Sequence, residues 1–284
     1  MRKSESGAGF VIPALVMLAA FTVYPIFSVF YLSLQRRLLV FDIVRFVGLE
    51  NYSFLFADMR FWNALKNTAY FTVTSVSLEF VLGLSVAVLL NREFRYKGFV
   101  RAIVLIPWAI PTVVSARMWE WMYNTDFGIL NYLLGTDINW LGSGFWALNA
   151  AVFMDVWKTT PFVAILLTAG MQVIPRELYQ AARVDGAGNW QIFRRITMPL
   201  LMPVILVVLI FRTLDAFRVF DAIYVLTGGG PANTTETLSI YAYKVLFQTL
   251  QFGYGSTLSV VVFMCIGGIT VFYIRLLTRR SSIL

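Results

Sequence analysis

Four charged residues recur at intervals of three within an apolar stretch: Arg212, Asp215, Arg218 and Asp221. Carboxylates accept hydrogen bonds and guanidinium groups donate them, so the four can neutralise one another along a helix or bind a hydroxyl-rich ligand. Aromatic side chains between them offer flat apolar faces. From the sequence alone, two interpretations stay open: an ion-pair ladder that holds helices together, and the polar wall of a cavity.

Two further polar groups lie beside prolines. Asp155, Lys158 and Thr159 precede Pro161, and the segment Pro107–Thr112 holds two prolines around a tryptophan. Proline removes a backbone donor from a helix, which favours a kink or break where these polar side chains gather. Each proline serves either packing alone or a binding site built at an interrupted helix.

The composition places these charges in a membrane protein. The chain of 284 residues is 59% hydrophobic and only 13% charged, whereas a soluble domain needs about 25% charged residues. The net charge of +8 then reflects basic loops rather than nucleic-acid binding. With no histidine and a single cysteine, Cys265, the sequence predicts neither a disulfide framework nor a metal site.

Six windows are long and apolar enough to cross a bilayer, which needs about 20 residues each. They predict an all-α polytopic membrane protein whose single transmembrane domain occupies the whole chain, residues 1–284, with a core at about 68–277. The windows are Gly7–Leu34, Thr68–Leu90, Phe99–Tyr123, Phe145–Val173, Leu200–Leu226 and Gly255–Leu277.

The distribution of basic residues predicts the orientation. Lysine and arginine near span ends favour the cytoplasm, and most of them fall on one side if both termini are cytoplasmic. Arg2 and Lys3 belong to this set. The first loop, about residues 35–67, should then be external, but its five basic residues do not fit an exported loop and have no explanation in the sequence.

The segment Pro175–Pro199 between the fourth and fifth windows does not resemble an ordinary loop. Proline at a helix start, then Leu178, Ala181 and Ala182 on one face, and Gly186 as a stop predict a short helix. A second short helix is expected at Asn189–Arg195. Such an element serves either as an interfacial connector or as a docking knob for a soluble partner.

The residues of this segment closely resemble the Glu-Ala-Ala…Gly loop of permease subunits in binding-protein-dependent ABC importers, in the carbohydrate branch of maltose and trehalose type. The similarity extends from about Phe46 to the C-terminus through Ile106–Pro111, Val156–Pro161 and Leu226–Pro231. Two positions depart from the family pattern, Gln180 for glutamate and Met198 for leucine. The resemblance implies the ABC type I importer permease fold, with a coupling helix in the cytoplasmic loop.

The resemblance also implies site residues. Those expected to contact the ATPase subunit are Gln180, Ala181, Ala182, Asp185 and Gly186. Those expected to bind substrate, carried over position by position, are Trp108, Thr112, Asp155, Lys158, Thr159, Phe162, Asp215, Ala216 and Val219; the charged ladder adds Arg218.

The implied function is ATP-driven import of a carbohydrate, such as trehalose or maltose, by alternating access in the cytoplasmic (inner) membrane. The implied partners are a second permease, a homodimeric ATP-binding subunit and an extracytoplasmic sugar-binding protein. The chain has no Gly-Lys dipeptide and so no phosphate-binding loop of its own; ATP and Mg are expected on the partner, with no catalytic residue and no cofactor here. Alternatives are a glycerophosphodiester or sugar-phosphate permease, an ATPase-independent secondary transporter and, least favoured, a membrane enzyme.

Overall fold

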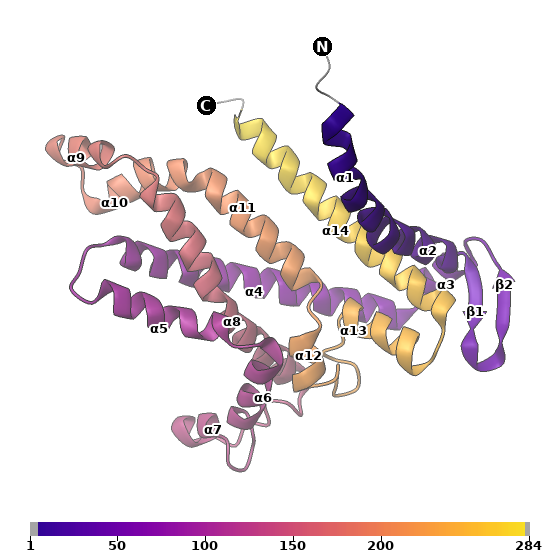
Figure 1. Cartoon of the computed structure of the whole chain (residues 1–284). Coiled ribbons are helices and arrows are strands. Elements are labelled where there is room, and N and C mark those ends of the chain that lie inside the picture. The colour runs from indigo at the N-terminus through magenta and orange to yellow at the C-terminus, as the bar shows by residue number, and fades with distance from the viewer. Residues whose placement is uncertain (1–4, 282–284) are drawn as a thin grey trace. The chain divides into compact units, whose positions relative to one another are not determined.

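The computed structural model describes residues 5–281, whose regular elements are helices apart from one hairpin (Figure 1). Arg2 and Lys3, part of the predicted cytoplasmic set, lie outside the described residues. In chain order the elements are α1 (Glu5–Leu18), the π-helical turn η1 (Ala19–Val23), α2 (Tyr24–Ser33), β1 (Gln35–Leu38), the 3-10 turn η2 (Leu39–Phe41), β2 (Ile43–Phe46), α3 (Glu50–Ala57), α4 (Met59–Asn91), α5 (Lys97–Ala109), α6 (Thr112–Met122), α7 (Ile129–Leu134), α8 (Gly144–Gln172), α9 (Arg176–Val184), α10 (Asn189–Ile192), the π-helical turn η3 (Phe193–Thr197), α11 (Met198–Phe217), α12 (Asp221–Leu226), α13 (Leu238–Tyr243), the π-helical turn η4 (Lys244–Gln248) and α14 (Phe252–Ser281).

Five continuous helical stretches among the described residues are long and apolar enough to cross a membrane. A sixth is available if the bent pair α5 and α6 counts as one span. The prediction of six spans is therefore confirmed when the bent pair is included. The continuous stretches are Val11–Ser33, Met59–Asn91, Gly144–Gln172, Asn189–Phe217 and Phe252–Leu276.

The third predicted span is broken. Helices α5 and α6 meet at 93°, and the chain between them is extended at Ile110 and Pro111. A residue before proline is driven out of the α-region, which ends α5 where the sequence indicated an interruption. The kink or break that the prolines predicted within Phe99–Tyr123 is therefore present, between α5 and α6.

The fifth predicted span, Leu200–Leu226, is also interrupted. Helix α11 ends at Phe217, and α12 begins at Asp221. A tight turn replaces the regular helical hydrogen bonds here. In it the amide of Val219 donates to the carbonyl of Ala216 at 3.2 Å. The freed carbonyl of Val219 accepts from the hydroxyl of Thr237 at 3.3 Å, so the break leaves this group satisfied. The four charged residues consequently do not share one stripe of one helix.

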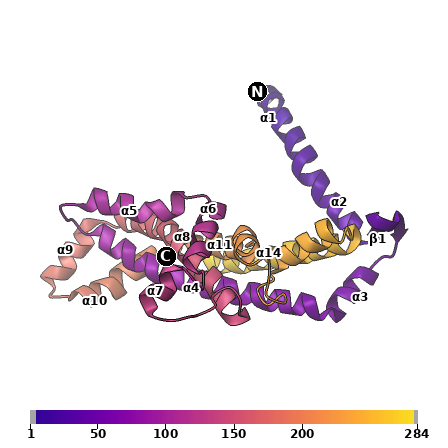
Figure 2. The same ribbon diagram turned by 90° about the horizontal axis from the view of Figure 1, so that it is seen from below.

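The predicted all-α fold is confirmed, and the first loop adds one short two-stranded hairpin to it. Strands β1 and β2 pair antiparallel, and Figure 2 shows β1 directly after the end of α2. The side-chain Nδ2 of Asn51 fixes this junction by donating to the carbonyls of Ser33 and Gln35 at 2.8 and 2.9 Å.

The described chain forms two compact units. One comprises the residues through Trp62 together with Tyr241–Cys265, and the other comprises Asn63–Ile240 together with the residues from Ile266. The second unit contains the long helices α4, α8 and α11 and the broken pairs α5/α6 and α11/α12. It therefore carries both the predicted substrate-binding residues and the predicted coupling segment.

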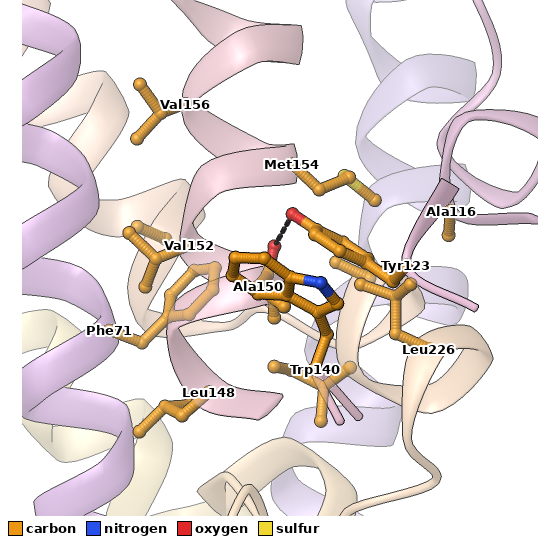
Figure 3. Close-up of a cluster of buried hydrophobic side chains, with 14 of the residues drawn as sticks. Phe71, Ala116, Tyr123, Trp140, Leu148, Ala150, Val152, Met154, Val156 and Leu226 are labelled. Atoms are coloured by element: carbon orange, nitrogen blue, oxygen red, sulfur yellow. Dashed lines mark hydrogen bonds between the residues drawn. The ribbon is translucent and has the colours of Figure 1, made fainter. Parts of the chain in front are cut away.

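Two apolar clusters hold the second unit together. One joins α4, α6, α8 and α12; in it the hydroxyl of Tyr123 donates to the carbonyl of Ala150 at 2.9 Å beside Trp140 (Figure 3). The other packs α4, α8 and α11 through residues such as Leu167 and Leu201.

Two glycines allow the three long helices to approach closely. A Cβ atom at Gly83 of α4 would lie 2.6 Å from the side chain of Val163 on α8. A Cβ atom at Gly170 of α8 would lie 2.8 Å from Leu201 on α11. Small residues at helix crossings bring backbones together in membranes, where lipid exclusion supplies little driving force. This tight packing sets α4, α8 and α11 at the distances that the site requires.

Candidate functional site

The guanidinium of Arg212 on α11 lies at the centre of the site. It donates through Nε and Nη2 to both carboxylate oxygens of Glu79 on α4, at 2.6 and 2.8 Å. Nη2 also reaches Asp155 of α8 at 3.1 Å, and Nη1 reaches Asp215 at 2.5 Å. Only 3% of Arg212 is exposed. One cation thus joins carboxylates from three helices, and this saturated cluster is the structural part of the predicted ladder.

The next two residues of the charged series, Asp215 and Arg218, are much more exposed than Arg212. Asp215 and Arg218 have side chains that are 57% and 67% exposed, and Nη2 of Arg218 lies 3.7 Å from Asp215. An exposed pair at this distance contributes little to stability. Their polar atoms therefore keep capacity for a ligand, while Arg212 has little left.

Two stacked aromatic rings belong to the same site. The rings of Trp108 on α5 and Phe162 on α8 stack with centroids 6.0 Å apart. The ammonium group of Lys158 donates to the carbonyl of Trp108 over 3.5 Å, a weak bond at the place where α5 ends. The hydroxyl of Thr159 donates to Glu79 at 2.7 Å and so links α8 to the arginine cluster.

These side chains surround one cavity of about 460 Å³, a size within the range of small-molecule sites. Three carboxylates and three basic groups line it, so its formal charge is balanced. Polar atoms and aromatic faces are presented to the same space. The lining residues are Trp108, Thr112, Asp155, Lys158, Thr159, Phe162, Phe211, Arg212, Asp215, Ala216, Arg218, Val219, Phe220, Asp221 and Ala222.

All ten residues predicted to bind substrate lie in this lining. They come from α5, α6, α8, the end of α11 and the turn after it. The structure thus brings together residues that are up to 111 positions apart in the sequence, Trp108 and Val219. Whether these residues bind a substrate stays a prediction.

The sequence-based selection left out several residues that shape the cavity. Glu79 of α4 binds Arg212 and so fixes the position of this arginine at the cavity. Phe220 and Asp221 line the cavity because the chain breaks between α11 and α12. Phe220 could have been predicted, because it is one of the aromatic residues between the four charged positions. The partner of Glu79 could not, because no local sequence pattern indicates which arginine a buried glutamate binds. Arg117 and Glu120, which do not line the cavity, form an ion pair with each other at 2.6 Å.

The predicted coupling segment forms the expected helix, glycine and second helix. Helix α9 starts after Pro175 with Glu177 in its first turn. Gly186 then takes a φ of +79°, which favours glycine. The five predicted contact residues lie on α9 and in the turn that follows it, and most of this surface is exposed; they are Gln180, Ala181, Ala182, Asp185 and Gly186.

The second helix of this segment differs from the expectation. Instead of ending at Arg195, α10 continues through η3 into α11 without interruption. Pro199 lies within this continuous helical run, directly after the π-helical turn η3, and does not break it. Figure 1 shows α9 and α10 at one end of α8 and α11, with α6 and α12 at the other. The segment and the cavity are thus joined by α11, which starts at one and ends at the other.

A resident metal site has no support among residues 5–281. No group of three or more potential ligand side chains is placed to hold an ion in this part of the chain.

The fold and the cavity define a permease of an ABC importer. The family model of the binding-protein-dependent transport system inner membrane component matches residues 79–282. The chain belongs to this family.

Curated relatives match nearly the whole chain. The trehalose/maltose transport system permease protein MalF of Thermococcus litoralis is 44% identical over 278 residues, covering 96% of this chain and 94% of the relative. The trehalose transport system permease protein SugA of Mycobacterium tuberculosis is 43% identical, covering 94% and 86%. The sulfoquinovosyl glycerol transport system permease protein SmoG of Agrobacterium fabrum is 38% identical, covering 95% and 89%.

Solved structures share the fold. A chain of a bacterial ABC transporter that imports the acidic polysaccharide alginate superposes with a TM-score of 0.85 at 23% identity, covering 96% of this chain and 94% of that one. A chain of the MetNI methionine ABC transporter gives 0.61 at 21% identity, covering 81% and 98%. The family match and the curated relatives, together with this fold, make the chain a multi-pass membrane subunit of an ABC sugar importer.

Proposed function

We propose that this subunit moves a neutral disaccharide such as trehalose or maltose into the cytoplasm by alternating access. The observation that carries the proposal is the cavity, whose lining combines Asp215 and Arg218 with the stacked rings of Trp108 and Phe162. Carboxylate and guanidinium groups match sugar hydroxyls, and aromatic faces match the apolar face of a sugar ring. Balanced charge on the lining favours a neutral ligand. The relatives that transport trehalose or maltose support the same substrate class.

In this proposal the chain works with other subunits. A second permease completes the pore, an extracytoplasmic binding protein delivers the sugar, and a homodimeric ATP-binding subunit holds ATP and Mg. The exposed α9 and Gly186 dock on that subunit, and α11 transmits its motion to the cavity. Both termini of the chain lie in the cytoplasm, on the side of the basic loops. A solved relative of the same fold was captured with a periplasmic protein, which fits this arrangement.

The test is sugar uptake by the complete complex in proteoliposomes supplied with its binding protein. Replacing Trp108 or Asp215 with alanine should lower uptake about fivefold or more, since a residue at the centre of a binding site is worth over 1 kcal/mol. The matched control is Trp121→Ala, because Trp121 is 74% exposed and does not line the cavity; its uptake should stay within about twofold. Normal uptake by both cavity variants would refute the proposed sugar site. Uptake without ATP would instead indicate a secondary transporter.

An anionic substrate is the second candidate. Arg218 is largely exposed toward the cavity and sits 3.7 Å from its carboxylate partner, so it retains donors for a phosphate or sulfonate. A permease for sulfoquinovosyl glycerol is among the relatives. Competition of glycerophosphodiesters against labelled trehalose separates the two, since a neutral-sugar site should not respond to them. Arg218→Gln should abolish transport of an anion while lowering that of a neutral sugar less.

A further inference from the structure

The connection between α12 and α13, residues 227–237, is a loop with a dense set of internal hydrogen bonds. The hydroxyl groups of Thr227 and Thr235 bond to each other at 2.7 Å. The hydroxyl of Thr235 donates to the carbonyl of Gly230 at 2.8 Å, and its amide donates to the carbonyl of Gly229 at 3.3 Å. Thr235 has no exposed surface. These bonds close the loop on itself, so its two ends keep a fixed separation.

The middle of this loop has a strained backbone that a neighbouring helix holds in place. Ala232 and Asn233 have φ of +47° and +61°, a left-handed conformation that is unfavourable for alanine because of its Cβ atom. Such strain persists only where surrounding contacts fix the backbone. Here the side-chain Nδ2 of Asn63 on α4 donates to the carbonyl of Asn233 at 2.9 Å. The loop is therefore attached to α4 at its middle.

Two buried side chains of α4 bind the end of the loop. The Nδ2 of Asn67 donates to the carbonyl of Glu236 at 3.0 Å. The adjacent Thr68 donates its hydroxyl hydrogen to the carbonyl of Ala64 and accepts from the amide of Leu238 at 2.9 Å. Leu238 begins α13, and the first amides of a helix have no partner within it. Thr68 therefore caps α13 and fixes its start against α4.

Thr237 lies between these two attachment points and binds the break in the fifth predicted span. Its side chain is fully buried, and its hydroxyl donates to the carbonyl of Val219 at 3.3 Å. Val219 and the three residues after it form one wall of the cavity, the wall 219–222; those three are Phe220, Asp221 and Ala222. This wall is thus connected through one side chain to α4, a helix from a much earlier part of the sequence.

We propose that Thr237, fixed by Asn67 and Thr68, is a positioning residue that keeps the wall 219–222 in place. None of the three side chains lines the cavity, so each acts through the backbone at the break. Without these bonds the carbonyl of Val219 loses its partner, and an unsatisfied carbonyl in the interior favours movement of the wall toward water. The consequence for transport rests on the proposed function, because it requires this cavity to be the sugar site. The positioning of the wall is independent of the ligand.

The first experiment measures the wall directly and needs no sugar. Cys265 is the only cysteine, so a Cys265→Ser background carries a single thiol at Ala222→Cys, a lining position that is 1% exposed. A water-soluble methanethiosulfonate should label this thiol in the full complex about fivefold faster when Thr237→Val or Thr68→Val is added, since one buried hydrogen bond is lost. Thr168→Val is the matched control, because this buried hydroxyl bonds within α8; the rate should stay within about twofold. Unchanged labelling in both test variants would overturn the proposal.

The second experiment separates positioning from a general loss of stability. Sugar uptake and ATP hydrolysis are measured together in proteoliposomes with sugar-loaded binding protein. We expect Thr237→Val to lower the sugar moved per ATP about fivefold, with ATPase activity within about twofold of wild type, because α9 and its turn are unchanged. Thr237→Ser keeps the hydroxyl and should restore the ratio. A parallel fall of uptake, ATPase activity and melting temperature would overturn the positioning role. Faster labelling at position 222 with normal uptake would support the positioning and count instead against the sugar site.

Discussion

Arg212 and Glu79, 133 residues apart in the sequence, form a two-bonded ion pair at 2.6 and 2.8 Å in the interior of the protein. Glu79 is fully buried, and the same guanidinium reaches Asp155 and Asp215. Burying charge costs several kcal/mol per ion unless partners and hydrogen bonds are well placed. The pair therefore fixes how α4 and α11 pack against each other. It also determines which nearby polar groups still have hydrogen-bonding capacity for a ligand.

Loss of the central arginine should be far more damaging than loss of the outer one. Arg212→Met leaves Glu79 and Asp155 without their common cation, which should lower the free energy of unfolding by about 3–5 kcal/mol. Arg218→Met is the control, and because its side chain is 67% exposed the loss should be at most about 1 kcal/mol. Thermal unfolding of the purified subunit in detergent measures both. Equal losses would mean that Arg212 is not the structural hub.

The turn after α9 should be required for coupling to the ATPase because of its backbone. Gly186→Ser places a side chain at φ +79°, a strain of about 1–2 kcal/mol, whereas open space surrounds the Cα. Gly188→Ser is the matched control: φ is −70° there, and serine is a favourable residue at a helix start. We expect sugar-stimulated ATPase activity of the complex to fall for Gly186→Ser and to stay near wild type for Gly188→Ser. The reverse order would argue against docking through this turn.

The crossing of α4 and α8 should not tolerate one additional methyl group. Gly83→Ala brings a Cβ atom to 2.6 Å from Val163, so the helices must move apart at a cost of about 1–3 kcal/mol. Gly267→Ala in α14 meets nothing within 4 Å and should change stability by less than about 0.5 kcal/mol. Uptake should fall with stability in the first variant, since the same crossing positions Asp155 and Thr159. Unchanged melting temperatures in both variants would show that α4 and α8 can accommodate a methyl group at position 83.

Asp58, just before α4, should give the protein a specific acid sensitivity. Burial alone raises the pKa of Asp58, but hydrogen bonds from Tyr241 at 2.5 Å, from Tyr254 at 2.7 Å and from the amides of Arg60 and Phe61 outweigh it and hold the pKa below the ordinary 3.8. A lowered folded-state pKa stabilises the protein above pH 3.8, and this contribution is lost as pH falls through the lower folded value.

The corresponding measurement is the melting temperature as a function of pH. Asp58→Asn should melt below wild type at neutral pH, and the two curves should converge as the pH falls below 3.8. Asp42→Asn, at an exposed position of the hairpin turn, is the control and should follow wild type throughout. A difference in melting temperature between Asp58→Asn and wild type that stays constant at every pH would show that the charge of the Asp58 carboxylate does not stabilise the protein.

The sequence by itself determined where the chain crosses the membrane, where α9 and its glycine turn lie, and which ten residues gather around a cavity. These features depend on short-range signals: runs of apolar residues, prolines that end helices, a glycine suited to positive φ, and motifs shared with a family. Each of these signals lies in a run of neighbouring residues, so it can be recognised without knowing how the helices pack.

Only the tertiary structure decided which charges are structural and which face the cavity. An unbroken fifth span would have placed Arg212, Asp215, Arg218 and Asp221 as equal rungs, but the break after Phe217 separates them. Arg212 becomes saturated because Glu79 and Asp155 arrive from other helices, and Arg36 meets Arg45 only through strand register. The energy of a buried charge depends on the partners that distant segments bring within hydrogen-bond range. The local sequence does not determine how close those partners come.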